Sequence, residues 1–149
     1  RGPQPISIAA KDQADQIDRV SALVSGWLDD GVDASSIALL ARTNQRASAL
    51  RDGLHSRGLS SNHITSAKAE GDRPVVMTMH TAKGMEFSRV VLFDISDGVM
   101  PQASLLKKVS AEEQADVLLR ERSLLYVAAS RARDVLAVTW AGTPSPLLG

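Results

Sequence analysis

The sequence contains no cysteine among its 149 residues. A disulfide-stapled scaffold and a thiolate metal site are therefore both excluded, and the composition fits a cytoplasmic protein. No run of about 18 apolar residues occurs, which argues against a membrane-spanning helix. Lys plus Arg (17) equal Asp plus Glu (17), so the formal net charge is zero. This balance argues against a dedicated, stand-alone DNA-binding module, because such modules are usually basic.

A phosphate-binding loop is also missing. A self-sufficient nucleotide hydrolase needs the pattern G-x-x-x-x-G-K-[ST] together with carboxylates that hold magnesium. Residues 81–84, Thr-Ala-Lys-Gly, lack the first glycine and have Lys and Gly in the wrong order. Asp94 ends an apolar run as a magnesium-binding aspartate would, but an aspartate there is more often a turn or cap residue. No metal site is therefore predicted within this chain.

Strand-like and helix-like segments alternate along the sequence. Short apolar runs predict strands at 6–9, 37–41, 75–79, 89–94 and 135–140. Helical spacing and capping residues predict helices that begin after Asp12, after Thr43 or Asn44, and after Ser110, the last one ending near Arg131. Alternation of this kind predicts an α/β fold, a three-layer α/β/α sandwich with a largely parallel sheet. Ligands of such sheets bind beyond the carboxyl ends of the strands, where we expect the polar loops to fall.

The alternating pattern covers residues 6–142, which are expected to form one domain. Residues 1–5 are too short and too polar for a signal peptide and are interpreted as a linker. Residues 143–149 contain two prolines and are interpreted as a tail. Between the second helix and the next long strand, residues 60–73 form a polar connection with one short strand expected near 63–65.

Three segments carry polar residues beside these apolar runs. Residues 78–87, Thr-Met-His-Thr-Ala-Lys-Gly-Met-Glu-Phe, join two strand-like runs, and loops on rigid scaffolds commonly carry binding sites. Residues 124–133, Leu-Leu-Tyr-Val-Ala-Ala-Ser-Arg-Ala-Arg, place two arginines at the end of an apolar helix. Residues 37–45, Ile-Ala-Leu-Leu-Ala-Arg-Thr-Asn-Gln, place one arginine after a buried strand.

In chain order, the segments at 37–45, 78–87 and 124–133 resemble motifs IV, V and VI of superfamily 1 DNA helicases of the UvrD/Rep/PcrA type. The resemblance covers most of the chain. It implies the second RecA-like motor domain of a 3′–5′ DNA helicase or translocase, with a P-loop NTPase fold that lacks its own P-loop. The family inserts a large accessory domain before motif V. Here only residues 59–74 separate the motif IV helix from the motif V strand, so that insertion is absent or cut to a short loop.

The resemblance also implies ligands and partners. ATP would bind between this domain and the N-terminal RecA-like domain of the same polypeptide, which would supply the ligands of Mg²⁺. Single-stranded DNA would be the second partner, and the isolated chain is expected to be inactive. Two rival hypotheses stay open: a degenerate, non-catalytic helicase-like module that binds protein or nucleic acid, and another RecA-like ATPase that acts on RNA or protein.

Four residues match the ATP-binding positions of the family. Arg131 would be an arginine finger and Arg42 would bind the γ-phosphate, and both would be catalytic. From the residues alone, Arg131 could equally be a charge that stabilises the end of a helix, and Arg42 could form a surface ion pair. Glu86 would accept hydrogen bonds from the ribose, or else pair with Lys83 or Arg89. Gly84 would allow a close approach of the backbone, or be an ordinary turn glycine.

Three residues match the DNA-contacting positions of motif V: His80, Thr78 and Lys83. Such contacts to phosphate carry no sequence information. The alternatives are a structural cap for His80 and a loop-orienting role for Lys83. Ala41 departs from the family, which has an aromatic residue there to stack on adenine, so adenine is expected to be held elsewhere.

Two further expectations concern the last helix. Tyr126 is expected in the core. Glu121 and Arg122 resemble the charged run that precedes the motif VI helix, or else form a solvated face.

Overall fold

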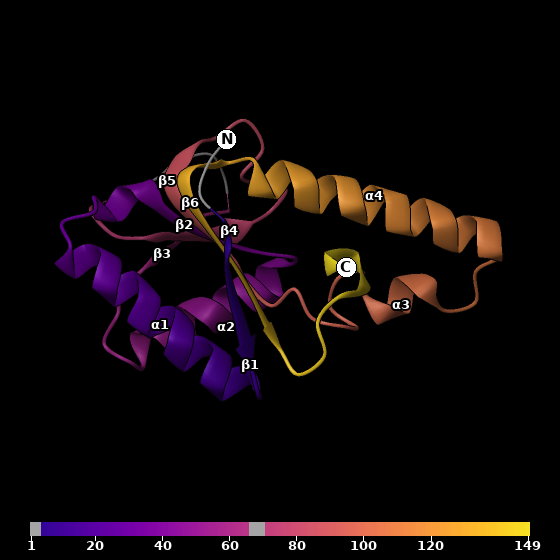
Figure 1. The fold of residues 1–149 in the computed structure, drawn as a ribbon, viewed down its shortest axis with the longest axis horizontal. Helices are drawn as coiled ribbons and strands as arrows, with labels where there is room; N and C mark the ends of the chain where they lie inside the picture. The colour runs from indigo at the N-terminus through magenta and orange to yellow at the C-terminus, as the bar shows by residue number, and fades with distance from the viewer. Residues whose placement is uncertain (1–3, 66–70) are drawn as a thin grey trace.

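The computed structural model describes residues 4–65 and 71–149. Three residues of the expected linker and 66–70 of the polar connection lie outside the described residues. The strands are β1 (Ile6–Ala10), β2 (Ile37–Ala41), β3 (Asn62–His63), β4 (Val75–Thr78), β5 (Phe87–Leu92) and β6 (Ala132–Ala141). They form one parallel sheet in the order β1-β6-β5-β2-β4-β3 (Figure 1).

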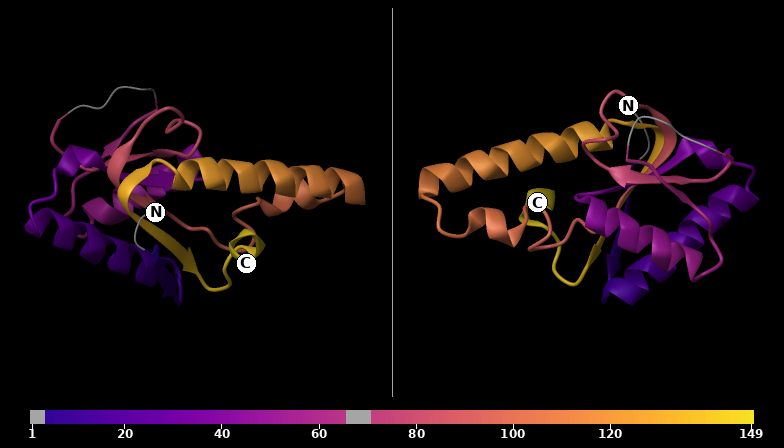
Figure 2. Two further views of the ribbon diagram at one scale, coloured as in Figure 1. Left: turned by 45° about the horizontal axis from the view of Figure 1, so that its top comes forward. Right: turned by 180° about the vertical axis from the view of Figure 1, so that it is seen from behind.

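Helices cover both faces of this sheet. On one face lie α1 (Gln13–Asp29) and α2 (Asn44–His55), and on the other lies α4 (Ala111–Ala129), preceded by the short α3 (Ala103–Leu106). Strand β2 shows the division, because Ile37 and Leu39 pack towards α1 and α2, while Leu40 packs towards α4. Figure 2 shows these layers from two further directions. The predicted three-layer α/β sandwich with a parallel sheet is confirmed.

The helix starts follow from capping residues in the sequence. The Asp12 side chain accepts a hydrogen bond from the backbone N–H of Asp15 at 2.8 Å, and Thr43 caps α2 in the same way. At the start of α4, Ser110 and Glu113 form a reciprocal capping box. All three predicted starts are therefore confirmed. None of the described helices is long and apolar enough to cross a bilayer.

Helix α4 extends well beyond the sheet (Figure 1). Its buried residues form one narrow stripe of four positions: Val117, Glu121, Leu125 and Ala128. Tyr126 lies off that stripe and is 77% exposed, so the expectation of a core tyrosine is wrong. The reason is that α4 packs on the domain along one side only, and apolar composition alone does not reveal which side that is.

Residues 143–149, expected as a tail, lie against the domain. Pro144 forms an antiparallel bridge with Ser96, and the backbone N–H of Ser145 donates to Ile95 at 2.9 Å. Leu147 packs against the hydrophobic cluster on the α4 side of the sheet. This segment therefore contributes to the core on that side.

Candidate functional site

The candidate residues lie at two opposite edges of the sheet. Arg42 directly follows β2 and Thr78 ends β4, which places both at the carboxyl edge of the parallel strands. Glu86 directly precedes β5 and Arg131 directly precedes β6, which places them at the amino edge. The expectation that the candidate loops fall at the carboxyl ends is therefore wrong for Glu86 and Arg131.

The segment 79–86 explains this division, because it carries the chain back from one edge to the other. Met79 and Ala82 are buried in the cluster beneath α4, and Met85 packs against it. The Thr78 hydroxyl accepts a hydrogen bond from the backbone N–H of Thr81 at 3.1 Å, which fixes the first turn. The segment is therefore a structured crossing over the sheet.

The three candidate DNA-contacting residues differ in their exposure along this crossing segment. His80 and Lys83 are exposed, and the structure shows no side-chain hydrogen bond or ion pair for either within its described residues. Thr78 is only 7% exposed, and its hydroxyl is engaged with Thr81. The first two side chains are available to a ligand, whereas Thr78 shapes the loop that presents them.

Gly84 and Glu86 form the exposed end of the crossing. Gly84 has a φ of 82°, in the left-handed region that favours glycine. The Glu86 carboxylate is exposed, and none of the described residues, Lys83 and Arg89 included, pairs with it. Its oxygens are therefore open to hydrogen-bond donors from outside the chain.

Gly84→Ala is expected to destabilise the domain by about 1–2 kcal/mol, because alanine is strained at a positive φ. A Cβ at position 84 would meet no atom within 4 Å, so the cost is one of backbone conformation alone. Gly26→Ala is the matched control: it has equally open space but lies inside α1, where alanine should stabilise by about 0.5–1 kcal/mol. Urea unfolding measures both, and a stabilising Gly84→Ala would contradict the need for glycine.

Arg131 lies beside Glu86 and is held only by neutral groups. Its Nη1 donates to the Met85 carbonyl at 3.2 Å, its Nε to the Val127 carbonyl at 3.3 Å and its Nη2 to the Ser130 hydroxyl at 3.1 Å. The contact with Val127 caps α4, as the helix-terminal alternative predicts. The contact with Met85 joins the guanidinium to the crossing segment, one residue from Glu86. No carboxylate among the described residues neutralises this charge.

Arg42, in contrast, forms a buried ion pair with Glu121 of α4. Its Nε and Nη2 donate to the two carboxylate oxygens at 2.8–3.2 Å, and the side chains are 12% and 6% exposed. Glu121 lies a little over two turns, about 12 Å, before the end of α4. The structure therefore brings Glu86, Gly84 and Arg131 together and leaves Arg42 apart from them. The alternatives of a surface ion pair for Arg42 and a solvated position for Glu121 are therefore both wrong.

A buried network around Asp94 was not predicted. Asp94 is 3% exposed with a φ of 64°, and its carboxylate accepts hydrogen bonds from Arg46 at 2.9 Å and Ser96 at 2.7 Å. Gln13 and Gln16 donate to it at 3.3 Å. The described residues contain no cluster suited to a metal ion. The turn-residue alternative fits this aspartate. Its distant partners could not be predicted from the sequence, because they lie on two other elements, α1 and α2.

The fold is similar to that of a solved protein, the C-terminal domain of a possible DNA helicase from Lactobacillus plantarum WCFS1. The TM-score is 0.78 at 23% identity, and the match covers 100% of this chain and 81% of the other. At that identity the likeness concerns the fold alone.

Curated relatives match part of the sequence. The ATP-dependent DNA helicase UvrD2 of Mycobacterium tuberculosis is 36% identical over 85 residues, which are 53% of this chain and 12% of that protein. The ATP-dependent DNA helicase PcrA of Staphylococcus aureus is 36% identical over 66 residues, 44% of this chain and 8% of the relative. The chain therefore spans about a tenth of the length of these relatives.

The family model described as the UvrD-like helicase C-terminal domain matches residues 57–143. This range contains the crossing segment, α4 and β6, and so includes Glu86 and Arg131. The chain belongs to the UvrD-like helicase C-terminal domain family.

Proposed function

We propose that this chain is the C-terminal motor domain of an ATP-dependent DNA helicase or translocase that moves 3′–5′ along single-stranded DNA. The names of its relatives, ATP-dependent DNA helicases, support this proposal. Because the chain spans only about a tenth of their length, the rest of the machine, including an N-terminal RecA-like domain, would belong to other parts of the polypeptide. The amino edge of the sheet would face that domain across the ATP.

One observation carries the proposal: Arg131 and Glu86 lie side by side, and neither forms an ion pair with any of the described residues. A carboxylate without a partner suits the two ribose hydroxyls, and a guanidinium on neutral acceptors suits phosphate oxygens, with which it forms stronger charge-assisted bonds. ATP with Mg²⁺ would supply the transferable phosphoryl group, with the metal ligands in the N-terminal domain. Arg131 would stabilise the charge that develops on the γ-phosphate, and Gly84 would let the backbone approach.

Arg42 was expected to bind the γ-phosphate together with Arg131, but its contacts favour a different role. For that role it would have to leave Glu121, and separating a buried pair leaves an uncompensated charge. Its place at the carboxyl edge favours a positioning role instead. Arg42 would hold α4, and thereby Arg131, in a defined orientation on the sheet.

DNA would bind on the outside of the crossing segment, at His80 and Lys83. The same eight-residue segment, 79–86, also contains Gly84 and Glu86. A shift of these two residues on ATP binding would therefore move the DNA-contacting residues of the segment. Ala41 is fully buried, which supports an adenine site built by other parts of the polypeptide. Closure and reopening of the ATP site would thus move the DNA-contacting residues along the strand.

His80→Ala in the full-length protein is expected to weaken binding of single-stranded DNA about 3- to 10-fold, the loss of roughly one hydrogen bond. DNA-stimulated ATP hydrolysis should fall more than basal hydrolysis. Fluorescence anisotropy with a labelled oligonucleotide at several salt concentrations measures the affinity. A larger loss of basal than of stimulated hydrolysis would overturn the assignment.

Lys83→Ala provides the comparison for this experiment. If both residues contact phosphates, Lys83→Ala should reduce the slope of log K against log salt by about 0.7, whereas His80→Ala, which removes a neutral group, should leave it unchanged. An unchanged slope for Lys83→Ala would favour the loop-orienting alternative. Arg120→Ala removes an exposed positive charge on α4, outside the crossing segment, and serves as a control that should leave DNA binding unchanged.

A further inference from the structure

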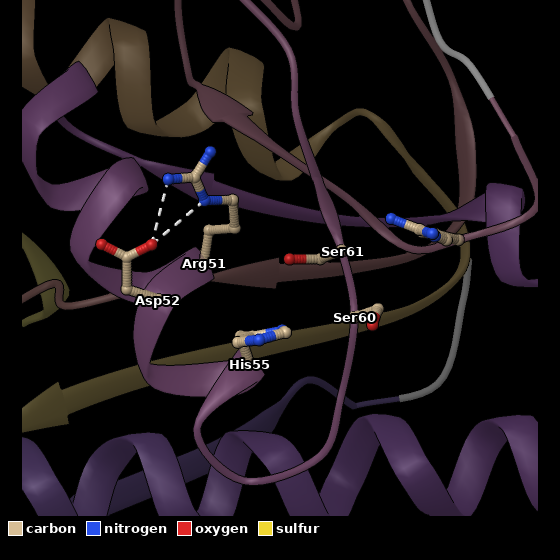
Figure 3. Close-up of a pocket in the computed structure, with 6 residues that line it drawn as sticks. Arg51, Asp52, His55, Ser60 and Ser61 are labelled. Atoms are coloured by element: carbon tan, nitrogen blue, oxygen red, sulfur yellow. Dashed lines mark hydrogen bonds and ion pairs between the residues drawn. The ribbon is translucent and has the colours of Figure 1, made fainter.

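A second polar site lies on the other side of the sheet, away from the crossing segment. A cavity of about 370 Å³ opens between the last turns of α2 and the residues that precede β3 and β4 (Figure 3). It is lined by Arg51, Asp52, His55, Ser60, Ser61 and Arg73. These residues play no part in the ATP or DNA contacts proposed above.

The cationic groups of this cavity are weakly committed. Arg51 pairs with Asp52 at 3.0 Å, but the two side chains are 43% and 69% exposed. Exposed pairs of this kind contribute little, and the arginine readily accepts a better partner. Arg73 is exposed and has no hydrogen bond or ion pair within the described part of the chain. Both guanidinium groups are therefore available to an anion.

Ser61 adds an independent observation. Its side chain is 8% exposed, and its hydroxyl has no hydrogen-bond partner among the described residues. In Figure 3 this hydroxyl points from its loop towards Arg51 and Asp52 on α2. Buried polar groups are nearly always paired, so an unpaired hydroxyl at a cationic cavity indicates a missing ligand.

The charges of the cavity also act on His63, which lies near it. Burial lowers the pKa of His63, and the nearby charge of Arg51 lowers it further, against an opposing contribution from Asp52. At His63, the effect of the Arg51 charge on the pKa is therefore larger than that of Asp52. The C-terminal dipole of α2 acts against an anion, but two of the donors, Ser61 and Arg73, lie on other segments that line the cavity.

We propose that this cavity binds a backbone phosphate of single-stranded DNA, as a second contact beyond His80 and Lys83. The inference rests on the proposed function for the identity of the strand. Arg73 precedes β4 and His80 follows it, and the seven residue steps between them span at most about 23 Å, a gap that several nucleotides of one extended strand can bridge. A cavity of about 370 Å³ is larger than one phosphate group, which leaves room for the attached sugar.

The first test uses the 149-residue chain and inorganic phosphate, followed by NMR of the histidine imidazoles. The wild type should show saturable shifts of His55, which lines the cavity, and of His63, and the Arg51→Ala/Arg73→Ala variant should lose them. Both arginines are exposed, so the fold should tolerate their removal. Absence of shifts in the wild type, unchanged shifts in the variant, or shifts confined to His80 would each overturn the phosphate site.

The second test identifies the source of the phosphate. A labelled oligonucleotide should bind the Arg51→Ala/Arg73→Ala variant at least 5-fold more weakly than the wild type, with a smaller salt slope, whereas Arg120→Ala should bind normally. ADP and AMP form the comparison arm, and they should shift the His55 and His63 imidazoles no more tightly than inorganic phosphate does. Tighter binding of ADP that shifts these two histidines and is lost in the Arg51→Ala/Arg73→Ala variant would assign the cavity to a nucleotide instead. Normal DNA binding by the double variant would refute this site and leave the proposed function intact, while His80→Ala tests that function separately.

Ser61→Ala distinguishes a role of the hydroxyl in phosphate binding from a role in the stability of the fold alone. Because the hydroxyl is buried without a partner, its removal should leave the melting temperature unchanged or raise it. Phosphate affinity should fall at the same time. A lower melting temperature with unchanged phosphate affinity would show that the hydroxyl serves the fold alone.

Discussion

Replacing Arg131 by alanine in the full-length protein is expected to lower DNA-stimulated ATP hydrolysis by about 10³- to 10⁵-fold, the contribution of an arginine finger. The affinity for single-stranded DNA should change little, because Arg131 lies at the amino edge, whereas His80 follows the carboxyl end of β4. Steady-state hydrolysis with saturating DNA, together with anisotropy of a labelled oligonucleotide, measures both quantities.

Two variants make this experiment specific. Arg133→Ala removes an exposed arginine two positions away and should leave turnover near normal. Arg131→Lys keeps the charge but loses the planar fork, so it should restore only a small part of the rate. If Arg131→Ala hydrolyses ATP almost normally and loses only about 0.3–1 kcal/mol of stability, the residue is a helix-terminal charge and no more.

Arg42→Ala is expected to destabilise the domain by about 3–5 kcal/mol, because it leaves the Glu121 carboxylate buried without its partner. Urea unfolding of the 149-residue chain measures the change in the free energy of unfolding. Arg51→Ala is the matched control, since it breaks an exposed arginine–carboxylate pair and should cost less than about 1 kcal/mol.

The double variant Arg42→Met/Glu121→Leu separates charge from packing. Apolar side chains of similar size should recover most of the stability, because no charge then remains buried. Equal costs for Arg42→Ala and Arg51→Ala would contradict a buried pair. In the full-length protein, a stable double variant with normal ATP hydrolysis would exclude the positioning role of Arg42.

The fold was predictable because its signals are local. Apolar runs, capping residues such as Asp12 and Ser110, and their alternation determine the order of strands and helices, which the structure confirms. Element ends differ by a few residues: β5 begins at Phe87 rather than 89, and the last helix ends at Ala129 rather than near Arg131. These ends depend on pairing between β5 and β6, which no local pattern contains.

The candidate site was predictable only in part. The motif resemblance singled out Glu86 and Arg131, which the structure places side by side, but a linear pattern does not reveal that the segment after β4 crosses the sheet before β5 begins. Nor does it reveal that Arg42 pairs with Glu121, 79 residues away, or that Asp94 gathers partners up to 81 residues distant. Contacts of that range are properties of the packed sheet rather than of any segment.

The projecting half of α4 has a mechanical consequence. The helix is attached to the sheet at Glu121 and again at its end through Arg131, whereas its first six residues, 111–116, are all exposed and contact α3 through a hydrogen bond from Gln114 to Leu106. From Ala111 to Glu121 the axial length is about 15 Å. A stiff rod pivoting at Glu121 by about 10° would swing its tip by about 3 Å over that length. Small adjustments at the arginine end would thus be transmitted, at a similar amplitude, to a tip that a neighbouring domain can contact.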